Sequence, residues 1–372
     1  MLTSTLRSRG FTLASICFWL LLTGGLNGAI NTTQAQARAY VASPCNNTVA
    51  IIDTGTNAVV TTIPVGSEPF VLAVTPDGTR VYVANRTGQN VSVIDTATNT
   101  VVSTIPLGRG GATGIVITPD GTRVYVTAFN TVFVIDTSTN TVIATIPDRF
   151  GFTYAAITPD GKQIYVTHAF ILETHTITVF DTATNTLAAT ILVPIRDQNP
   201  TGIAIAPDGA RAYVATRFGG MPVIDTATNF LLASLSVSGF FQIVITPDGA
   251  RAYASSVFDR TVSVIDIATD TVVGTIPGSG GNLSYLAVTA DGARVYVSSG
   301  TAPGGRVSVI DTATNTIIDE IPEIECSLGI AIAPPKFPES KDDCKDAGFQ
   351  RFGPPAFRNQ GQCLRYVKDH AN

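Results

Sequence analysis

The chain alternates short apolar runs with turn-forming residues at a nearly constant spacing. One unit, read from Leu72 to Gly108, holds the runs LAVT, RVYVAN, VSVID and TVVSTIPLG, separated by Pro-Asp-Gly, a polar loop and Thr-Ala-Thr-Asn. These runs are rich in β-branched and aromatic residues and are mostly too short for a helix. The pattern predicts four short antiparallel strands in each unit.

The residues between the runs suit tight turns. In Thr75-Pro76-Asp77-Gly78, proline fixes φ for the second position of a type I turn, and glycine accepts the left-handed conformation that returns the chain. Asp95 closes the third run, where its carboxylate is placed to accept hydrogen bonds from the amides of the following Thr-Ala-Thr-Asn turn. We therefore expect these recurring acids to be structural.

The number of units follows from the aspartate that closes the third run. It recurs at intervals of 41 to 45 residues, as Asp53, Asp95, Asp136, Asp181, Asp225, Asp266 and Asp311. The glycine of the first hairpin recurs only six times, as Gly78, Gly121, Gly161, Gly209, Gly249 and Gly292. Seven copies of a four-strand unit predict an all-β fold, a seven-bladed β-propeller.

The unequal counts indicate that the chain begins inside a blade. Residues 38–65 supply strands two, three and four of one blade, and Gly329–Ala333 has the character of a first strand without its hairpin. The C-terminal strand would then complete the blade that the N-terminal strands begin, a 3+1 closure that leaves no unpaired interior edge. A solenoid with open ends is the alternative architecture, and it does not account for the split blade.

The repeated motifs resemble those of the bacterial and archaeal YVTN-repeat β-propellers. The motif that names this family appears as Tyr82-Val83-Ala84-Asn85, with TPDG and DTATN companions, and the resemblance covers residues 38–335. The resemblance implies the propeller fold. The family includes cell-surface and surface-layer proteins of unknown ligand, with lactonase-like and cofactor-binding propellers as more distant relatives, so the resemblance does not specify a function.

The N-terminal segment differs from the repeats. Residues 1–37 carry Arg7 and Arg9, an apolar run over 11–22 and an Ala-Gln-Ala sequence before Arg38, which together indicate a cleaved signal peptide. A transmembrane anchor is the alternative, but the run is shorter than the roughly twenty residues of a spanning helix. We therefore predict an exported protein in the periplasm, at the cell surface or outside the cell, with no integral membrane segment after cleavage.

The charge of the mature chain bears on its partners. Cleavage leaves 21 basic residues against 28 acidic ones, a net charge near −7. A surface of this sign repels phosphate backbones, so no nucleic-acid partner is expected.

Four cysteines remain after cleavage. Cys344 and Cys363 lie in a tail, residues 336–372, that resembles a short cysteine-bracketed segment appended to many secreted bacterial proteins. Cys45 falls in the predicted loop between strands two and three of the split blade, and Cys326 falls just before the strand that closes it. We predict a disulfide between these two, worth about 2–5 kcal/mol because it closes a very long loop. Free thiols or another pairing are the alternatives.

The predicted propeller sorts its loops onto two faces. Here the top face is the one with the loops that join strands two and three and the loops that enter strand one. The bottom face carries the Pro-Asp-Gly and Thr-Ala-Thr-Asn turns. Because the bottom turns are nearly uniform and the top loops vary, a functional site is expected on the top face.

Few residues suggest catalysis. The sequence contains no haem motif, serine nucleophile elbow or phosphate-cradling glycine loop, and we predict no cofactor. His168 and His175, with Glu173 between them, are assigned to the longest top loop, and this trio has the chemistry to bind zinc or to act as acid and base. A solvated loop insertion is the alternative.

Arginine and phenylalanine side chains also fall in the predicted top loops. Paired arginines suit a carboxylate or another polar ligand, and the candidates are Arg109, Arg149, Arg196 and Arg217. Aromatic side chains exposed together would mark a partner surface, and the candidates are Phe129, Phe150, Phe152, Phe170, Phe218, Phe240, Phe241 and Phe258. A solvated charged rim and rings that fill gaps between blades are the alternatives.

Three functions are compatible with these features. The first is a non-catalytic binding module that presents its top face to a protein or glycan of the cell envelope. The second is a lactonase-like hydrolase at the top mouth of the channel, using His168 or His175 with an arginine. The third is a structural component of the cell surface or of a surface layer.

Overall fold

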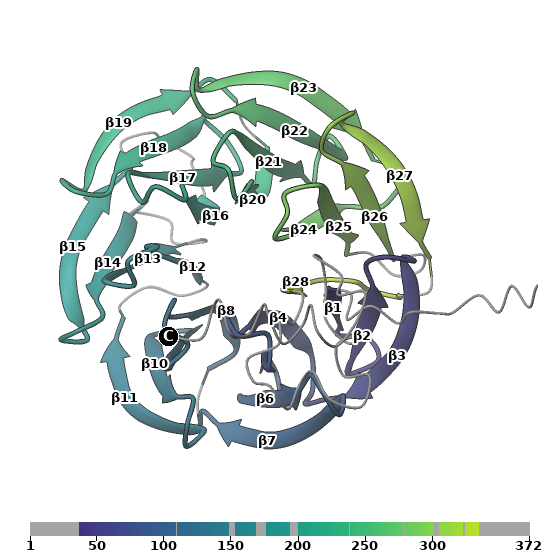
Figure 1. The fold of residues 1–372 in the computed structure, drawn as a ribbon. Helices are drawn as coiled ribbons and strands as arrows, with labels where there is room; N and C mark the ends of the chain where they lie inside the picture. The colour runs from purple at the N-terminus through teal and green to yellow at the C-terminus, as the bar shows by residue number, and fades with distance from the viewer. Residues whose placement is uncertain are drawn as a thin grey trace, which may run out of the picture. The chain divides into compact units, whose positions relative to one another are not determined.

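Seven four-stranded antiparallel sheets form the blades of a ring (Figure 1). The computed structural model describes residues 37–108, 110–148, 153–168, 176–193, 200–237, 239–278, 280–300, 305–322 and 324–334. Within these ranges the chain contains strands and turns but no helix. The predicted seven-bladed, all-β propeller is confirmed.

The blades are numbered here from the one that contains the first strand. Blade 1 consists of β28 (Ile330–Ala333), β1 (Arg38–Ser43), β2 (Thr48–Asp53) and β3 (Ala58–Pro64). Blades 2 to 4 consist of β4 (Pro69–Val74), β5 (Arg80–Asn85), β6 (Asn90–Asp95), β7 (Thr100–Pro106), β8 (Ala112–Ile117), β9 (Arg123–Ala128), β10 (Thr131–Asp136), β11 (Thr141–Pro147), β12 (Thr153–Ile157), β13 (Gln163–His168), β14 (Thr176–Asp181) and β15 (Thr186–Leu192). Blades 5 to 7 consist of β16 (Pro200–Ile205), β17 (Arg211–Thr216), β18 (Met221–Asp225), β19 (Phe230–Leu235), β20 (Phe240–Ile245), β21 (Arg251–Ser256), β22 (Thr261–Asp266), β23 (Thr271–Pro277), β24 (Leu283–Val288), β25 (Arg294–Ser299), β26 (Arg306–Asp311) and β27 (Thr316–Ile321).

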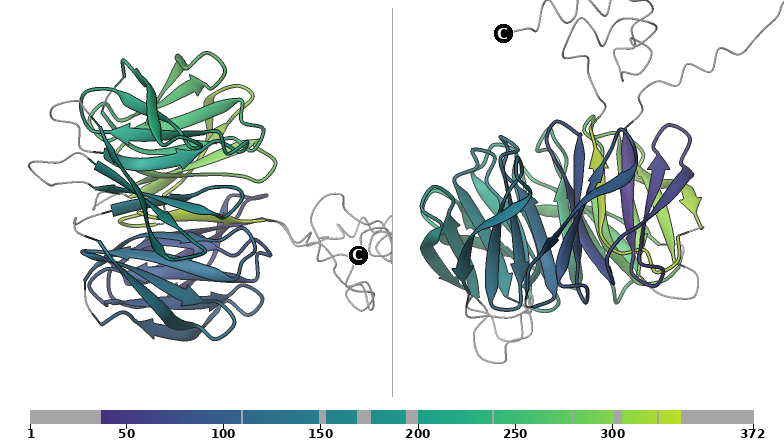
Figure 2. Two further views of the ribbon diagram at one scale, coloured as in Figure 1. Left: turned by 90° about the vertical axis from the view of Figure 1, so that its left-hand side faces the viewer. Right: turned by 90° about the horizontal axis from the view of Figure 1, so that it is seen from below.

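The ring closes in blade 1. β28 pairs antiparallel with β1, from Arg38 opposite Ala333 to Val41 opposite Ile330, and the two strands lie side by side in Figures 1 and 2. At the top end of this sheet a disulfide joins Cys45 to Cys326, with 5.9 Å between their Cα atoms. The predicted 3+1 closure and the Cys45–Cys326 disulfide are both confirmed.

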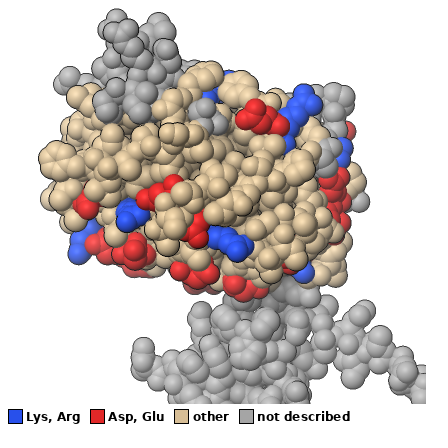
Figure 3. Space-filling view, turned by 90° about the horizontal axis from the view of Figure 1, so that it is seen from above, with Lys and Arg blue, Asp and Glu red and all other residues tan. Residues whose placement is uncertain are grey.

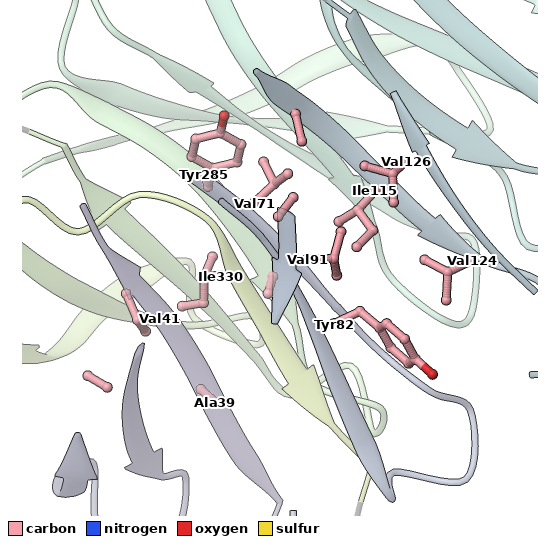
Figure 4. Packing of buried hydrophobic residues seen from close by; sticks show 14 of the residues in the cluster. Ala39, Val41, Val71, Tyr82, Val91, Ile115, Val124, Val126, Tyr285 and Ile330 are labelled. Carbon is pink, nitrogen blue, oxygen red and sulfur yellow. The ribbon is translucent and has the colours of Figure 1, made fainter. Parts of the chain in front are cut away.

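The second strand of every blade is buried because it lies between two neighbouring sheets. Its pattern of one partly exposed residue followed by five buried ones recurs in all seven blades. Side chains from adjacent blades pack together between the sheets; one cluster contains Tyr82 of the second strand of blade 2 and Ile115 of blade 3 (Figure 4). Burial of β-branched side chains between blades is therefore the main hydrophobic contribution to the ring.

A tyrosine in each second strand binds the next blade. All seven tyrosine side chains are fully buried. In six blades the hydroxyl donates to the residue that ends the turn between strands three and four of the following blade, for example Tyr82 to Asn140 Oδ1 at 2.8 Å and Tyr296 to Asn57 Oδ1 at 2.7 Å. The other four pairs are Tyr125–Asn185, Tyr165–Asn229, Tyr213–Asp270 and Tyr253–Asn315.

The seventh pair differs. At the junction of blades 1 and 2, Arg38 Nη1 donates to Asn99 Oδ1 at 3.1 Å, and the hydroxyl of Tyr40 has no hydrogen-bond partner among the described residues. The asparagines in these turns adopt a left-handed conformation, with φ near 55°, which asparagine tolerates better than most residues. Tyrosine and asparagine thus have complementary roles in neighbouring repeats.

The recurring aspartates hold the bottom turns, as predicted. Asp95 Oδ1 accepts hydrogen bonds from the amides of Ala97 and Thr98 at 3.0 and 2.8 Å. In the first hairpin, the Gly78 amide donates to the Thr75 carbonyl at 2.8 Å, and the glycine has φ of 67°. These acids stabilise turns rather than forming a reaction centre.

A β-bulge interrupts the outer strand of every blade. In each pair of third and fourth strands the register shifts at one point, so that one residue of the outer strand is skipped. The skipped residues are Val60, Val102, Ile143, Ala188, Leu232, Val273 and Ile318. A bulge twists an edge strand and disfavours pairing with another chain, so these aliphatic side chains are exposed on an edge that is protected from strand addition.

The tyrosine bond to the next blade can be measured against the blade that lacks it. Tyr82→Phe should lower the free energy of unfolding by about 1–2 kcal/mol, because it leaves a partly buried amide oxygen without its donor. Tyr40→Phe is the matched control and should cost much less, since its hydroxyl has no partner among the described residues. Urea unfolding measures both variants. Equal losses would show that the hydroxyl bond contributes nothing specific.

Removal of the closing disulfide should destabilise the ring. The double variant Cys45→Ser, Cys326→Ser should lose about 2–5 kcal/mol of unfolding free energy, because the bond restricts a loop that spans a sequence separation of 281 residues. The double variant Cys344→Ser, Cys363→Ser is the control, and it leaves this bond in place. Denaturant unfolding without reductant compares the two, and equal midpoints would contradict a closing role.

Candidate functional site

Four aromatic rings pack together across the central channel at the top ends of the inner strands. Phe70 of β4, Tyr154 of β12 and Phe241 of β20 each contact the ring of Tyr285 of β24, at centroid distances of 6.0, 6.1 and 5.5 Å. Phe241 also contacts Tyr154 edge-on at 5.7 Å. These four residues, from blades 2, 4, 6 and 7, are called the channel plug.

Glycine occupies the position of the two plug tyrosines in other blades. Tyr154 and Tyr285 lie five residues before the turn position that proline usually occupies, and the same position is Gly202 in blade 5 and Gly329 in blade 1. A Cβ atom on Gly202 would lie 1.9 Å from the Gln242 side chain, and one on Gly329 would lie 2.6 Å from the Phe70 carbonyl oxygen. These glycines therefore allow the inner strands of neighbouring blades to approach closely.

The tyrosines of the plug are shielded from solvent. Tyr154 is 9% exposed and Tyr285 is 4% exposed, and the Tyr285 hydroxyl donates to the Tyr154 hydroxyl at 3.3 Å. Burial raises the pKa of Tyr154 to about 12 and raises the pKa of Tyr285 well above its ordinary value. A ligand on the top face would meet this apolar floor rather than enter between these rings.

Arg86 lies over the edge of the plug. Its guanidinium carbon is 4.6 Å from the centroid of the Phe70 ring, and its Nη2 forms an ion pair with Glu68 Oε1. A Cβ atom on Gly111 would lie 2.7 Å from Arg86 Cγ, so the glycine leaves space for this side chain. The Arg86 charge is thus already partnered at the channel mouth.

A more exposed group of side chains lies on the top loops of blades 5 and 6. Phe218 and Phe258 are 49% and 51% exposed, and their rings stack with centroids 5.8 Å apart and an interplanar angle of 27°. The guanidinium carbon of Arg217 lies 5.1 Å from the centroid of the Phe258 ring. Together with Asp259 and Arg260, these residues are called the blade 5–6 patch.

Tight loops hold this patch in place. After β17, Gly219 and Gly220 take positive φ values of 84° and 113°, and the Thr216 hydroxyl bonds the Gly220 carbonyl, so the chain turns directly behind Phe218. After β21, the Ser256 hydroxyl and the Asp259 carboxylate lie 3.1 Å apart, and the Asp259 amide donates to the same hydroxyl at 3.0 Å. The two phenylalanines therefore project from short, hydrogen-bonded turns.

His168 does not lie in a loop, in contrast to the prediction. It is the last residue of β13 and is 1% exposed. Its Nε2 atom lies 2.9 Å from Thr178 Oγ1 and 3.8 Å from Asp148 Oδ1, so the imidazole links blade 4 to the end of blade 3. Its predicted companions Glu173 and His175 are outside the described residues. Within the described ranges no group of three metal-ligating side chains is close enough to hold an ion.

The remaining predicted residues separate into three groups. Phe129 is 54% exposed on the top loop of blade 3, whereas Phe240 is a core residue of blade 6, 3% exposed, and Phe241 belongs to the plug. Of the four predicted arginines, the structure describes Arg217, and it brings this residue together with Phe218 and Phe258. Residues outside the described ranges are Arg109, Arg149, Arg196, Phe150, Phe152, Phe170, Cys344 and Cys363.

The bottom face carries many acidic side chains. Acidic side chains gather along the lower edge of the ring in Figure 3, where the bottom turns lie. The Ser138 hydroxyl, with the Thr139 amide and hydroxyl, lowers the pKa of Asp136 to about 2. The Thr158 hydroxyl and the Lys162 amide do the same for Asp160. Asp136 and Asp160 therefore stay ionised at and well below neutral pH.

Comparisons with known proteins identify the fold alone. No family model and no curated protein sequence match this chain. A solved structure described as hydrazine synthase from Kuenenia stuttgartiensis is 22% identical, with a TM-score of 0.67, covering 74% of this chain and 92% of that chain. A functionally unknown protein from Desulfotomaculum acetoxidans is 21% identical, with a TM-score of 0.70, covering 80% of this chain and 99% of its own. Such similarity supports a shared propeller and no shared activity.

The buried tyrosines predict a loss of stability in alkali. Their pKa values in the folded protein are raised, to about 12 for Tyr154, Tyr165 and Tyr213, above an ordinary value of 10. Their contribution to stability is full below about pH 10 and is lost as the pH rises through about 12, because the unfolded chain releases these protons first. Urea unfolding at pH 8–12, with phenolate absorbance recorded in parallel, measures this. A constant midpoint over that range would contradict it.

Proposed function

We propose that this chain is a non-catalytic binding propeller that docks a protein partner on its top face, at the blade 5–6 patch. The observation that carries this proposal is the stack of Phe218 on Phe258. Two rings, each about half exposed, are held by short turns beside an arginine. Aromatic residues and arginine are enriched at the centres of protein interfaces, where they fill pockets of the partner.

The geometry favours binding over turnover. In the hydrolase alternative, the substrate would bind at the top mouth of the channel. The rings of the channel plug cover that mouth. His168 is buried and therefore does not contact a surface ligand. A preorganised patch also loses little side-chain entropy on association, because its rings and guanidinium already contact each other. Both features support a docking surface.

We further propose that the protein acts outside the cytoplasm. The Cys45–Cys326 disulfide supports this, because such bonds persist in oxidising compartments. Throughout the residues that the structure describes, no helix has the length and apolar character needed to cross a membrane. The segment predicted to direct export, residues 1–37, lies almost entirely outside the described part.

Quantitative capture tests the proposed surface. The mature chain and the double variant Phe218→Ala, Phe258→Ala are immobilised and exposed to an envelope extract of the source organism, and bound proteins are measured by mass spectrometry. The double variant should capture at least about tenfold less of the principal partner than the native chain does. This loss is expected when two side chains that each contribute about 1 kcal/mol or more to binding are removed.

Phe230→Ala is the matched control. Phe230 is 73% exposed on the outer strand β19, away from the top loops, so its loss should leave capture unchanged. Equal capture by the double variant and the native chain would refute the proposed surface. Retention of glycans in place of proteins, lost in the same variant, would replace the protein partner by a carbohydrate one.

A further inference from the structure

The bottom face of the propeller carries an excess of acidic side chains. The strands and turns at the bottom carry fourteen acidic side chains, Asp53, Asp77, Asp95, Asp120, Asp136, Asp160, Asp181, Asp208, Asp225, Asp248, Asp266, Asp270, Asp291 and Asp311. They carry seven basic ones, Arg38, Arg80, Arg123, Lys162, Arg211, Arg251 and Arg294. The bottom face is therefore strongly negative and repels an acidic partner.

The blade 5–6 patch has the opposite balance. Its named residues are two arginines, one acid and the two rings: the Arg217 guanidinium lies over the Phe258 ring, Arg260 follows Phe258 by two residues, and Asp259 contacts the Ser256 hydroxyl. Arg260 is exposed and has a φ of 53°, in the turn that directly precedes β22. A small cationic and aromatic area thus lies on a chain whose overall charge is negative.

We infer that the partner docks an acidic segment on this patch, with an apolar side chain against Phe218 and Phe258 and carboxylates facing Arg217 and Arg260. The inference rests on the proposed function and specifies the chemistry of its partner. Arginine binds carboxylates through paired donors. Arg217 is already oriented on the Phe258 ring, so a carboxylate would meet a preorganised guanidinium.

Electrostatics would also set the orientation of docking. A segment with negative charge is repelled by the bottom turns and attracted to the patch, so the encounter is guided to one face. Charges on opposite faces are separated by much more than the screening length of about 8 Å at physiological salt, so the repulsion from the bottom acts little once the segment is bound.

Three synthetic hexapeptides, blocked at both ends, test the inference on the mature chain. They are Asp-Glu-Trp-Phe-Glu-Asp, its basic counterpart Lys-Arg-Trp-Phe-Arg-Lys, and the acidic control without rings, Asp-Glu-Ala-Ala-Glu-Asp. Fluorescence anisotropy of labelled peptides should show the acidic aromatic peptide binding about tenfold or more tightly than either of the others. Raising the salt from 0.05 to 0.5 M should weaken its binding severalfold.

Variants assign the effect to the patch. Arg217→Gln and Arg260→Gln should each lower the preference for the acidic peptide over the basic one severalfold, whereas Lys162→Gln, which removes an exposed charge from the bottom face, should not change it. Phe218→Ala with Phe258→Ala should weaken both aromatic peptides. Thermal melting of each variant confirms that the ring is intact.

The outcomes separate this inference from the proposed function. Equal binding of acidic and basic aromatic peptides, tighter binding of the basic one, or no binding of any peptide would overturn the acidic segment. None of these results decides the proposed surface, because the capture experiment tests that surface separately. An acidic preference that persists in both arginine variants would also overturn the inference, because it would originate elsewhere on the chain.

Discussion

The ring depends on a hydrogen bond between the tyrosine of one blade and the turn of the next. Its donor is a buried phenol, and its acceptor is the left-handed residue that ends a turn, so six of the seven blades fix the outer hairpin of the next blade. The bond is directional, whereas the aliphatic packing around it is not. The apolar layers hold the blades together, and the tyrosine bonds set the register between them. At the junction of blades 1 and 2, Arg38 binds the acceptor instead, and Arg38 belongs to the strand that β28 pairs with to close the ring.

Much of this architecture could be predicted because the same motif residue marks the same strand in every repeat. The aspartate of the third strand gave the number of blades, and the unequal count of glycines located the split blade. The pairing of Cys45 with the cysteine at position 326 followed from that split. The tyrosine bond itself was not foreseen, because its two residues are about 58 positions apart in different repeats. Nothing in a single repeat connects them.

The functional surface was only partly predictable. Arg217, Phe218 and Phe258 were placed on the top face by loop assignment, but their stacking depends on the angle between two blades. His168 was misplaced by the same reasoning, since a strand that extends one residue further carries it into the interior. The channel plug was missed, although Tyr154 and Tyr285 occupy a position where three of the other blades have glycine. Comparison of that position around the repeats would have revealed it.

Closure by β28 has a consequence for how the protein is made. The first strand of the ring emerges early in synthesis, but its partner comes almost 290 residues later, so the contact that completes blade 1 is among the most distant in the chain. Blades 2 to 7 each consist of contiguous strands and are free to form in order. Blade 1 has an unpaired edge at β1 until β28 has been synthesised. Contacts of such long range slow folding, so closure of the ring should be the last and slowest step of assembly.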